Sequence, residues 1–183
     1  MHKDVTIYID TREQTPLQFP AHLPILDPNR PAPDRKSTTI KVTTVSTKLE
    51  TGDYALRGYE GQCLIERKGG IREVAKNCLD ATDRKRFIKA IDRLKAACLH
   101  PYVMLEGSLL DMTQDRNVPD WWNAVDSLQR ILLERNIGLI LLPNMGLAQR
   151  KLVGEWVARL LVNASLCPIL GPTTPTEEPA CPT

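Results

Sequence analysis

The stretch CLIERKGG, residues 63–70, passes from one periodicity to another. Its apolar beginning, Cys63 to Ile65, has the length of a strand, and the two glycines at its end are typical of a break. Beyond the glycines, apolar residues recur at helical spacing as far as Leu79. The stretch therefore predicts a strand over 63–65 that leads directly into a helix over 71–79.

Two charged side chains at the end of this strand leave it on the same side. Glu66 and Lys68 are two positions apart, and alternate residues of a strand share a face, so Arg67 points the other way. Asp53 begins the preceding short apolar run, Tyr54–Leu56, and the turn-like RGYEG joins the two runs. Pairing of these runs as a hairpin would bring the carboxylate of Asp53 close to that of Glu66.

Two carboxylates and an ammonium in one place are suited to phosphoryl chemistry. Carboxylate oxygens are ligands that Mg²⁺ or Mn²⁺ prefers, and such an ion also binds substrate phosphate and activates a water. The compact charge of Lys68 could hold that water or offset charge on the phosphate. A surface ion pair between neighbouring strands is the alternative. The apolar Leu64 and Ile65 before Glu66 favour the site, because a buried charge needs a partner or a metal.

The rest of the chain is a succession of strand and helix patterns. Strands that cluster first and then alternate with helices are typical of a mixed sheet with helices on its faces. We therefore expect an α/β fold, a mixed central sheet flanked by helices, in one domain over residues 1–165. The remaining strands are expected at 5–10, 38–45, 102–105 and 137–142, and the remaining helices from an N-cap at Thr82 or Asp83 to Cys98, over 119–135 and over 146–164.

Proline marks two parts that lack this periodicity. Six of the 14 prolines fall between Pro16 and Pro33, and we expect residues 15–36 to form a long surface loop. Five more fall between Pro168 and Pro182, and residues 166–183 are expected to be a disordered tail. Both segments would lie outside the packed core.

The net charge of +2 conceals a basic segment. Residues 67–95 contain ten Lys or Arg and four Asp or Glu, a net charge of +6, so the rest of the chain carries −4. A patch of this kind suits a polyanion, although a solvated helix face would have the same composition.

The composition also excludes several classes of protein. Five cysteines without a CxxC pair argue for reduced thiols and against a zinc site or a disulfide framework. No run is apolar enough for a membrane span or a signal peptide. We expect a cytoplasmic protein, or a nuclear one in a eukaryote, with no membrane partner and no secretion.

Five strings, in this order, resemble one known family. They are IYIDTREQ (7–14), LETGDYAL (49–56), CLIERKGG (63–70), RFIKAIDRL (86–94) and YVMLEG (102–107). Together they are similar to the nuclease domain of the XPF-type structure-specific endonucleases, particularly stand-alone phage and prokaryotic members. The resemblance implies a restriction-endonuclease-like fold. It also implies hydrolysis of one DNA strand near a junction between duplex and single strand, supported by Mg²⁺ or Mn²⁺, in DNA repair or recombination.

The resemblance assigns roles to the residues of these motifs. Asp53 and Glu66 match the metal carboxylates, Lys68 the catalytic lysine, and Arg67 the motif arginine that activity requires. The acids of the first motif would help to hold the metal or orient its water. The implied metal set is Asp10, Glu13, Asp53 and Glu66.

Binding of DNA is expected from two groups of residues. Arg12 and Gln14 would sit on the DNA backbone beside the first-motif acids. The basic segment would give affinity through phosphates, while specificity would come from DNA shape, such as a flap, fork or four-way junction. The expected phosphate contacts of the basic segment are Arg84, Arg86, Lys89 and Arg93.

The sequence departs from the family in three places. Arg72 stands where the motif has an aspartate, and Glu73 is the candidate to replace it. Ala90 stands where a glutamine often follows Arg86 by four residues. No tandem helix-hairpin-helix domain follows, so we expect DNA to be gripped by the basic face or by an accessory DNA-binding protein. Residues around Trp156 in the apolar last helix are compatible with a homodimer.

Three functions remain open. The first is a metal-dependent, structure-specific DNA endonuclease. The second is a Holliday-junction resolvase or a general nickase of the same fold. The third is a non-catalytic subunit that binds branched DNA and supports an active partner. Arg72 favours the third, whereas the intact Asp53, Glu66, Arg67 and Lys68 argue against it.

Overall fold

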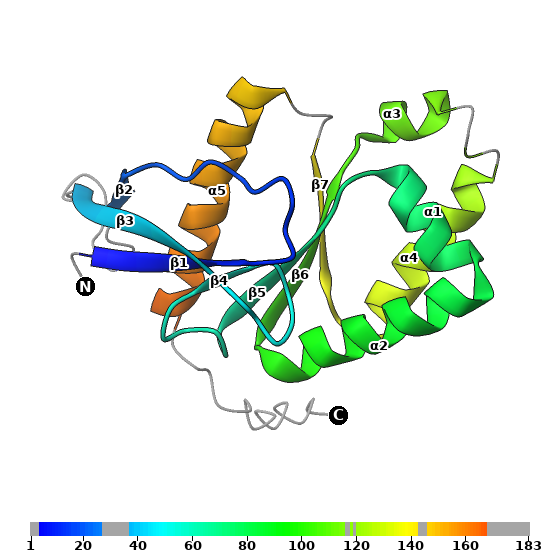
Figure 1. The fold of residues 1–183 in the computed structure, drawn as a ribbon, viewed down its shortest axis with the longest axis horizontal. Helices are drawn as coiled ribbons and strands as arrows, with labels where there is room; N and C mark the ends of the chain where they lie inside the picture. Colours follow the sequence, from blue (N-terminus) through cyan, green and yellow to red (C-terminus); the bar gives the residue numbers. More distant parts are fainter. Residues whose placement is uncertain (1–3, 27–36, 116–117, 119, 143–145, 168–183) are drawn as a thin grey trace, which may run out of the picture.

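The computed structural model describes residues 4–26, 37–115, 118, 120–142 and 146–167. A seven-stranded sheet of order β2-β3-β1-β4-β5-β6-β7 forms its centre, with helices on both faces (Figure 1). The expected α/β class with a mixed central sheet is confirmed. The strands are β1 Asp4–Asp10, β2 His22–Leu26, β3 Ser37–Thr47, β4 Tyr54–Leu56, β5 Cys63–Lys68, β6 His100–Glu106 and β7 Gly138–Leu142. The helices are α1 Ile71–Leu79, α2 Ala81–Ala97, α3 Leu109–Gln114, α4 Trp121–Leu133 and α5 Leu147–Leu166.

Strand direction determines which motifs meet. β1 is parallel to β3 and antiparallel to β4, β4 is antiparallel to β5, and β5, β6 and β7 are parallel to one another. The carboxyl ends of β1, β5 and β6 therefore lie at the same edge of the sheet as the amino end of β4. This edge brings together Asp10, Asp53, Lys68 and Glu106, although they are far apart in the sequence.

Each face of the sheet has its own apolar core. Leu64 and Val103 belong to the core covered by α1, α2 and α4, whereas Ile65 and Met104 belong to the core covered by α5 (Figure 1). Neighbours in a strand thus lie in different cores, as the alternation of strand side chains requires. Helices on either face of the sheet can therefore contribute side chains to a site at the shared edge.

The expected loop over 15–36 is wrong in part, because it contains β2. Leu23 and Ile25 are buried and alternate with exposed neighbours, the pattern of a half-buried strand. Pro24 is tolerated because β2 is the edge strand, where a missing N–H need not cost a ladder bond. Residues 27–36 lie outside the described residues.

Two further differences come from short-range capping. Helix α2 begins after Asp80, whose carboxylate accepts hydrogen bonds from the backbone N–H groups of Thr82 and Asp83 at 2.9 and 2.8 Å. The N-cap expected at Thr82 or Asp83 is therefore wrong by two to three residues. The unexpected helix α3 begins with a capping box formed by Ser108 and Asp111.

The last two elements also differ in detail from the expectation. β7 is only partly buried because it is the other edge strand, and Leu141 is 41% exposed. Helix α5 continues to Leu166, the first residue of the expected tail, and residues 168–183 lie outside the described residues. No helix in the described part of the chain is long and apolar enough to cross a bilayer.

Candidate active site

An open pocket of about 470 Å³ lies at the shared edge of the sheet. The loop after β1, the residue before β4, the end of β5 and the first turn of α1 all contribute to its wall. The residues that line it are Arg12, Glu13, Gln14, Thr15, Asp53, Glu66, Arg67, Lys68, Gly69 and Glu73. The structure thus gathers most of the predicted catalytic and metal residues in one place.

Asp53 enters the pocket from the turn before β4. Its Oδ2 accepts a hydrogen bond from the backbone N–H of Arg67 at 2.7 Å, and its own N–H donates to the carbonyl of Ile65 at 2.8 Å. Gly52 turns the chain into this position with φ +77°, which a residue with a side chain rarely adopts. Burial, and then the charge of Glu66, raise the pKa of Asp53 to about 7. The charge of Glu66 therefore disfavours the charged form of Asp53.

Lys68 leaves β5 on the same side as Glu66, and its ammonium lies between the carboxylates of Glu66 and Glu73. Its Nζ is 2.8 Å from Oε1 of Glu66 and 3.2 Å from Oε1 of Glu73, and it stands over the ring of Phe87 at 5.5 Å. Burial acts to lower the pKa of Lys68, but Glu66 and Glu73 more than compensate and the net shift is upward. The side chain is therefore a cation in the folded protein and is not suited to act as a base.

Glu73 occupies the pocket whereas Arg72 turns away from it. Oε2 of Glu73 accepts a hydrogen bond from the backbone N–H of Gly69 at 2.8 Å. Nε of Arg72 instead lies 2.6 Å from Oδ2 of Asp115, which follows α3. A helix turns by about 100° per residue, so neighbours in its first turn face different ways. This geometry places an acid beside Lys68 despite the arginine at the motif position.

Arg67 joins a group of buried charges on the other side of β5. Its Nη1 lies 2.9 and 3.0 Å from the two carboxylate oxygens of Glu13, and its Nε pairs with Glu106. The three side chains are 9%, 6% and 8% exposed. Glu106 also contacts Arg150 of α5, with Nη1 of Arg150 3.3 Å from Oε2. The wall of the pocket at Glu13 is therefore supported by a chain of four charges of alternating sign, Glu13, Arg67, Glu106 and Arg150.

Glu106 and Arg150 were not among the site residues predicted from the sequence. Glu106 lies within the string YVMLEG, and it ends a strand whose residues 103–105 are fully buried. A charged residue directly after a buried apolar run, in a strand parallel to β5, is the sequence signal that indicates Glu106. Arg150 has no comparable signal, because its partner is 44 residues away.

Asp10 does not line the pocket. Its Oδ1 accepts from the backbone N–H and from Nε of Arg12, both at 2.7 Å, and its Oδ2 accepts from Nη2 of Arg12 and from the backbone N–H of Leu49. Burial opposes the charged form, but the hydrogen bonds from Arg12 and Leu49 leave its pKa below the usual value. The expected metal contact of Asp10 stays a prediction; in the structure both of its oxygens accept hydrogen bonds that hold two loops together.

The predicted DNA contacts fall into two separate groups. Arg12 and Gln14 line the pocket and are exposed. The other four stand on the exposed face of α2 and do not line the pocket, because the opposite face of that helix packs its apolar side chains against the sheet. These four are Arg84, Arg86, Lys89 and Arg93.

The donor set of the pocket fits a hard divalent cation. In the part of the chain that the structure describes, no group of three or more His, Cys, Asp and Glu side chains is arranged to hold a metal. Glu13 pairs with Arg67, and Glu73 pairs with Lys68 and with the N–H of Gly69. Asp53 and Glu66 lie beside the paired residues Tyr54 and Ile65 and are therefore neighbours. Mg²⁺ is commonly bound by one or two carboxylates together with waters and substrate phosphate, and this pair meets that requirement.

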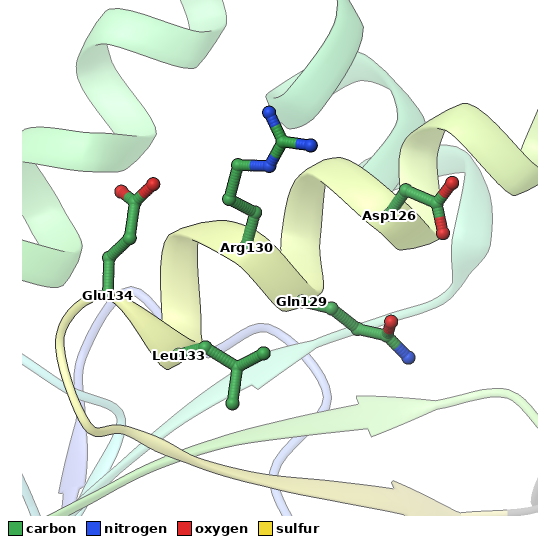
Figure 2. Close-up of a pocket in the computed structure, with 5 residues that line it drawn as sticks. All are labelled: Asp126, Gln129, Arg130, Leu133 and Glu134. Carbon is green, nitrogen blue, oxygen red and sulfur yellow. The ribbon is translucent and has the colours of Figure 1, made fainter.

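A second hollow lies on the exposed side of α4 (Figure 2). One helix and its C-cap residue supply its whole lining, which is Asp126, Gln129, Arg130, Leu133 and Glu134. None of the motif residues contributes to this hollow. The predicted catalytic residues lie instead in the pocket at the carboxyl ends of β1 and β5.

The chain is an α/β domain with a mixed sheet, and a charged pocket that contains Asp53, Glu66 and Lys68 lies at one edge of that sheet. The model of the ERCC4 domain family matches residues 9–145, which is most of the chain. The chain belongs to the ERCC4 domain family, a family of structure-specific DNA endonucleases. The resemblance to XPF-type nuclease domains is thereby confirmed.

Two solved structures share the fold. XPF from Aeropyrum pernix has a TM-score of 0.56 and 18% identity, over 96% of this chain and 70% of that chain. XPF from Aeropyrum pernix in complex with DNA has a TM-score of 0.53 and 19% identity, over 90% of this chain and 68% of that chain. No curated protein sequence matches this chain. At these identities the structures establish the common fold, and the roles of the individual residues rest on the geometry of this chain.

Proposed function

We propose that this chain is a metal-dependent endonuclease that hydrolyses a DNA strand near a branch or a junction between duplex and single strand. The observation that carries the proposal is the convergence of Asp53, Glu66, Lys68 and Glu73 in one open pocket. Two facing carboxylates, one of them with a raised pKa, have an unfavourable interaction that a divalent cation would relieve.

Asp53 and Glu66 would hold the Mg²⁺ or Mn²⁺ ion. When bound, the ion would polarise the scissile phosphate and lower the pKa of a water. Glu13 would line the same space, but its pairing with Arg67 through both oxygens would give it an orienting role, in which it fixes the guanidinium of Arg67 at the pocket wall. Asp53 and Glu66 would thus bind the ion, whereas Glu13 would pair with Arg67.

Lys68 would stabilise the negative charge of the phosphate. Its side chain is only 10% exposed and its ammonium is held by Glu66 and Glu73, so its field acts in a region with little water. It can donate a hydrogen bond from Nζ to a phosphate oxygen or to the attacking water without any change in its own protonation. Glu73 would keep Nζ in place and would thereby replace the acid that the family motif has at the position of Arg72.

DNA would be bound by the pocket rim and by α2. Arg12 and Gln14, which line the pocket and are exposed, would contact phosphates next to the scissile bond, and the basic face of α2 would add contacts that do not read sequence. A family structure in complex with DNA supports this substrate class. A second copy of this chain or an accessory DNA-binding protein is the further partner we propose, in the compartment that holds the DNA.

Cleavage of a panel of labelled DNAs tests the proposal. Flap, fork, nicked, four-way and linear substrates are incubated with Mg²⁺, Mn²⁺ or EDTA, using the wild type, Glu66→Gln and Lys68→Met. Lys41→Met serves as a matched control, because Lys41 is an exposed lysine on β3 that does not line the pocket. We expect metal-dependent cleavage near junctions that both site variants abolish and the control retains.

Other outcomes would select another function. A marked preference for four-way junctions with symmetrical cuts would indicate a resolvase, and cleavage irrespective of structure a general nickase. Absence of cleavage with either metal, together with equal junction binding by all variants, would indicate a non-catalytic subunit. The turn of Arg72 towards Asp115 weakens that third case, since it leaves the pocket to Glu73.

A further inference from the structure

Arg150 reaches the active-site edge from the opposite layer of the molecule. It lies in the first turn of α5, whereas Nζ of Lys68 lies over Phe87 of α2 and beside Glu73 of α1, on the other face of the sheet. Its side chain is 14% exposed, which is unusual for an arginine outside a specific site. None of the motifs includes this residue.

One guanidinium makes two different contacts. Nη1 of Arg150 lies 3.4 and 3.3 Å from the two carboxylate oxygens of Glu106, and Nη2 donates to the backbone carbonyl of Thr15. Thr15 ends the pocket-lining segment 12–15, and its own N–H donates to Oε1 of Glu13 at 2.7 Å. Arg150 therefore contacts both the acid that pairs with Arg67 and the loop that carries Glu13.

The same loop is packed against α5 just beyond this contact. At Gly154 the helix backbone comes so close to the carbonyl of Gln18 that any Cβ there would overlap it. The backbone N–H of Leu17 also donates to the hydroxyl of Tyr54 at 3.1 Å. The loop after β1 thus has its position set by α5 on one side and by β4 on the other.

Charge balance explains why Arg150 matters to the pocket. Glu13, Arg67, Glu106 and Arg150 form a neutral group of four largely buried charges. Without Arg150, the two glutamates would share Arg67 alone, and an uncompensated buried charge is costly. A cation in the first turn of a helix is disfavoured by the helix dipole, so its interaction with Glu106 must offset this cost.

We infer that Arg150 is a positioning residue of the active site, which holds Glu106 and the loop of Glu13 in one geometry so that Arg67 and Asp53 keep theirs. This inference rests on the proposed function for its kinetic consequence. Its structural content, that one side chain ties α5 to the pocket loop, stands on the contacts themselves.

Arg159 provides the matched control. It lies further along the same helix, donates from Nη1 to the carbonyl of Pro24 at 2.7 Å and pairs with Glu155 at 2.7 Å. The hydrogen bond to Pro24 therefore ties α5 to β2, in the segment after β1. The contacts of Arg159 do not involve the residues that line the pocket. Loss of Arg159 removes a tether without disturbing the charges of the site.

The experiment compares wild type, Arg150→Met, Arg150→Lys and Arg159→Met. Steady-state cleavage of the preferred junction with Mn²⁺ gives kcat and KM, and hydrogen exchange of the metal-free proteins reports on residues 11–18. For Arg150→Met we expect kcat to fall by about ten- to a hundredfold with little change in KM, since misplaced catalytic groups cost rate. Arg150→Lys should recover part of kcat, because one ammonium can satisfy Glu106 or Thr15 but not both. Arg159→Met should keep the wild-type kcat.

Exchange at residues 11–18 is expected to be faster in Arg150→Met than in Arg159→Met. Equal kcat in these two variants, or a folded Arg150→Met with wild-type exchange, would overturn the inference. Should Arg150→Met fail to fold, a wild-type kcat in Arg150→Lys would overturn it as well. If the wild type itself does not cleave, the proposed function fails, and the exchange data then decide the positioning role independently.

Discussion

The ammonium of Lys68 lies 3.2 Å from the carboxylate of Glu73, across the turn from β5 to α1. Because Gly69 also donates its N–H to Glu73, the acid is fixed at the place where the pocket meets the helix. The neighbouring Arg72 is directed at Asp115 instead. The shift by one residue therefore preserves an acid in the pocket.

Replacement of Glu73 is expected to impair cleavage more than replacement of Arg72. Glu73→Gln removes the charge that helps to position Nζ of Lys68, and we expect kcat to fall by about tenfold, as for the loss of one preorganised electrostatic contact. Arg72→Gln breaks an exposed ion pair that is worth little. Single-turnover cleavage of the preferred substrate measures both. A larger loss in Arg72→Gln would show that the arginine is the functional residue.

The raised pKa of Asp53 predicts how the stability of the metal-free protein depends on pH. Its pKa is 3.8 in the absence of these interactions and about 7 in the folded state, so the folded protein binds the proton more tightly. The free energy of unfolding should therefore fall as pH rises from about 4 to about 7, by about 1.4 kcal/mol for each unit of pKa difference. Urea denaturation in EDTA across this range measures the slope.

Asp53→Asn should remove most of that slope, since it cannot bind the proton. Asp126→Asn is a suitable control, because Asp126 lies on the exposed side of α4 (Figure 2). An unchanged slope in Asp53→Asn would refute the assignment of the raised pKa to this carboxyl.

The exposed face of α2 is expected to bind phosphates. Reversal of charge in Arg84→Glu combined with Lys89→Glu should weaken DNA binding and reduce the slope of log K against log salt by about 2, one for each lost contact. Fluorescence anisotropy at several salt concentrations gives both quantities. Arg57→Glu, an exposed change between β4 and β5, is the control. Wild-type affinity of the double variant at low salt would exclude α2 from the DNA interface.

Gly154→Ala should destabilise the protein although alanine is the better helix former. Alanine gains about 1 kcal/mol of helix propensity over glycine, but its Cβ would overlap the carbonyl of Gln18. Overpacking of this kind costs about 1–3 kcal/mol, so thermal stability should drop on balance. Gly61→Ala, whose Cβ would meet nothing within 4 Å, should be neutral. A stabilised Gly154→Ala would mean that the loop moves away from α5 without cost.

Much of the fold follows from patterns within short stretches. The period of two in β1, β3 and β5 and the helical spacing in α1 and α2 are local, so both the element types and the α/β class could be predicted. β2 was missed because Pro24 argues against a strand unless its place at the sheet edge is known. The start of α2 was misplaced because several capping residues stand side by side.

Some residues of the site could likewise be predicted from local patterns, whereas others were placed only by the tertiary structure. Glu66 and Lys68 lie in β5 and Asp53 directly precedes its partner strand β4, so spacing and alternation were enough to predict from the sequence alone that they would meet. The inward turn of Asp10, the selection of Glu73 over Arg72 and the Glu106–Arg150 pair were decided only by the tertiary structure. These features depend on the order of the parallel strands and on the position of α5 at the same edge of the sheet. Contacts between segments so far apart produce no periodic pattern in the sequence.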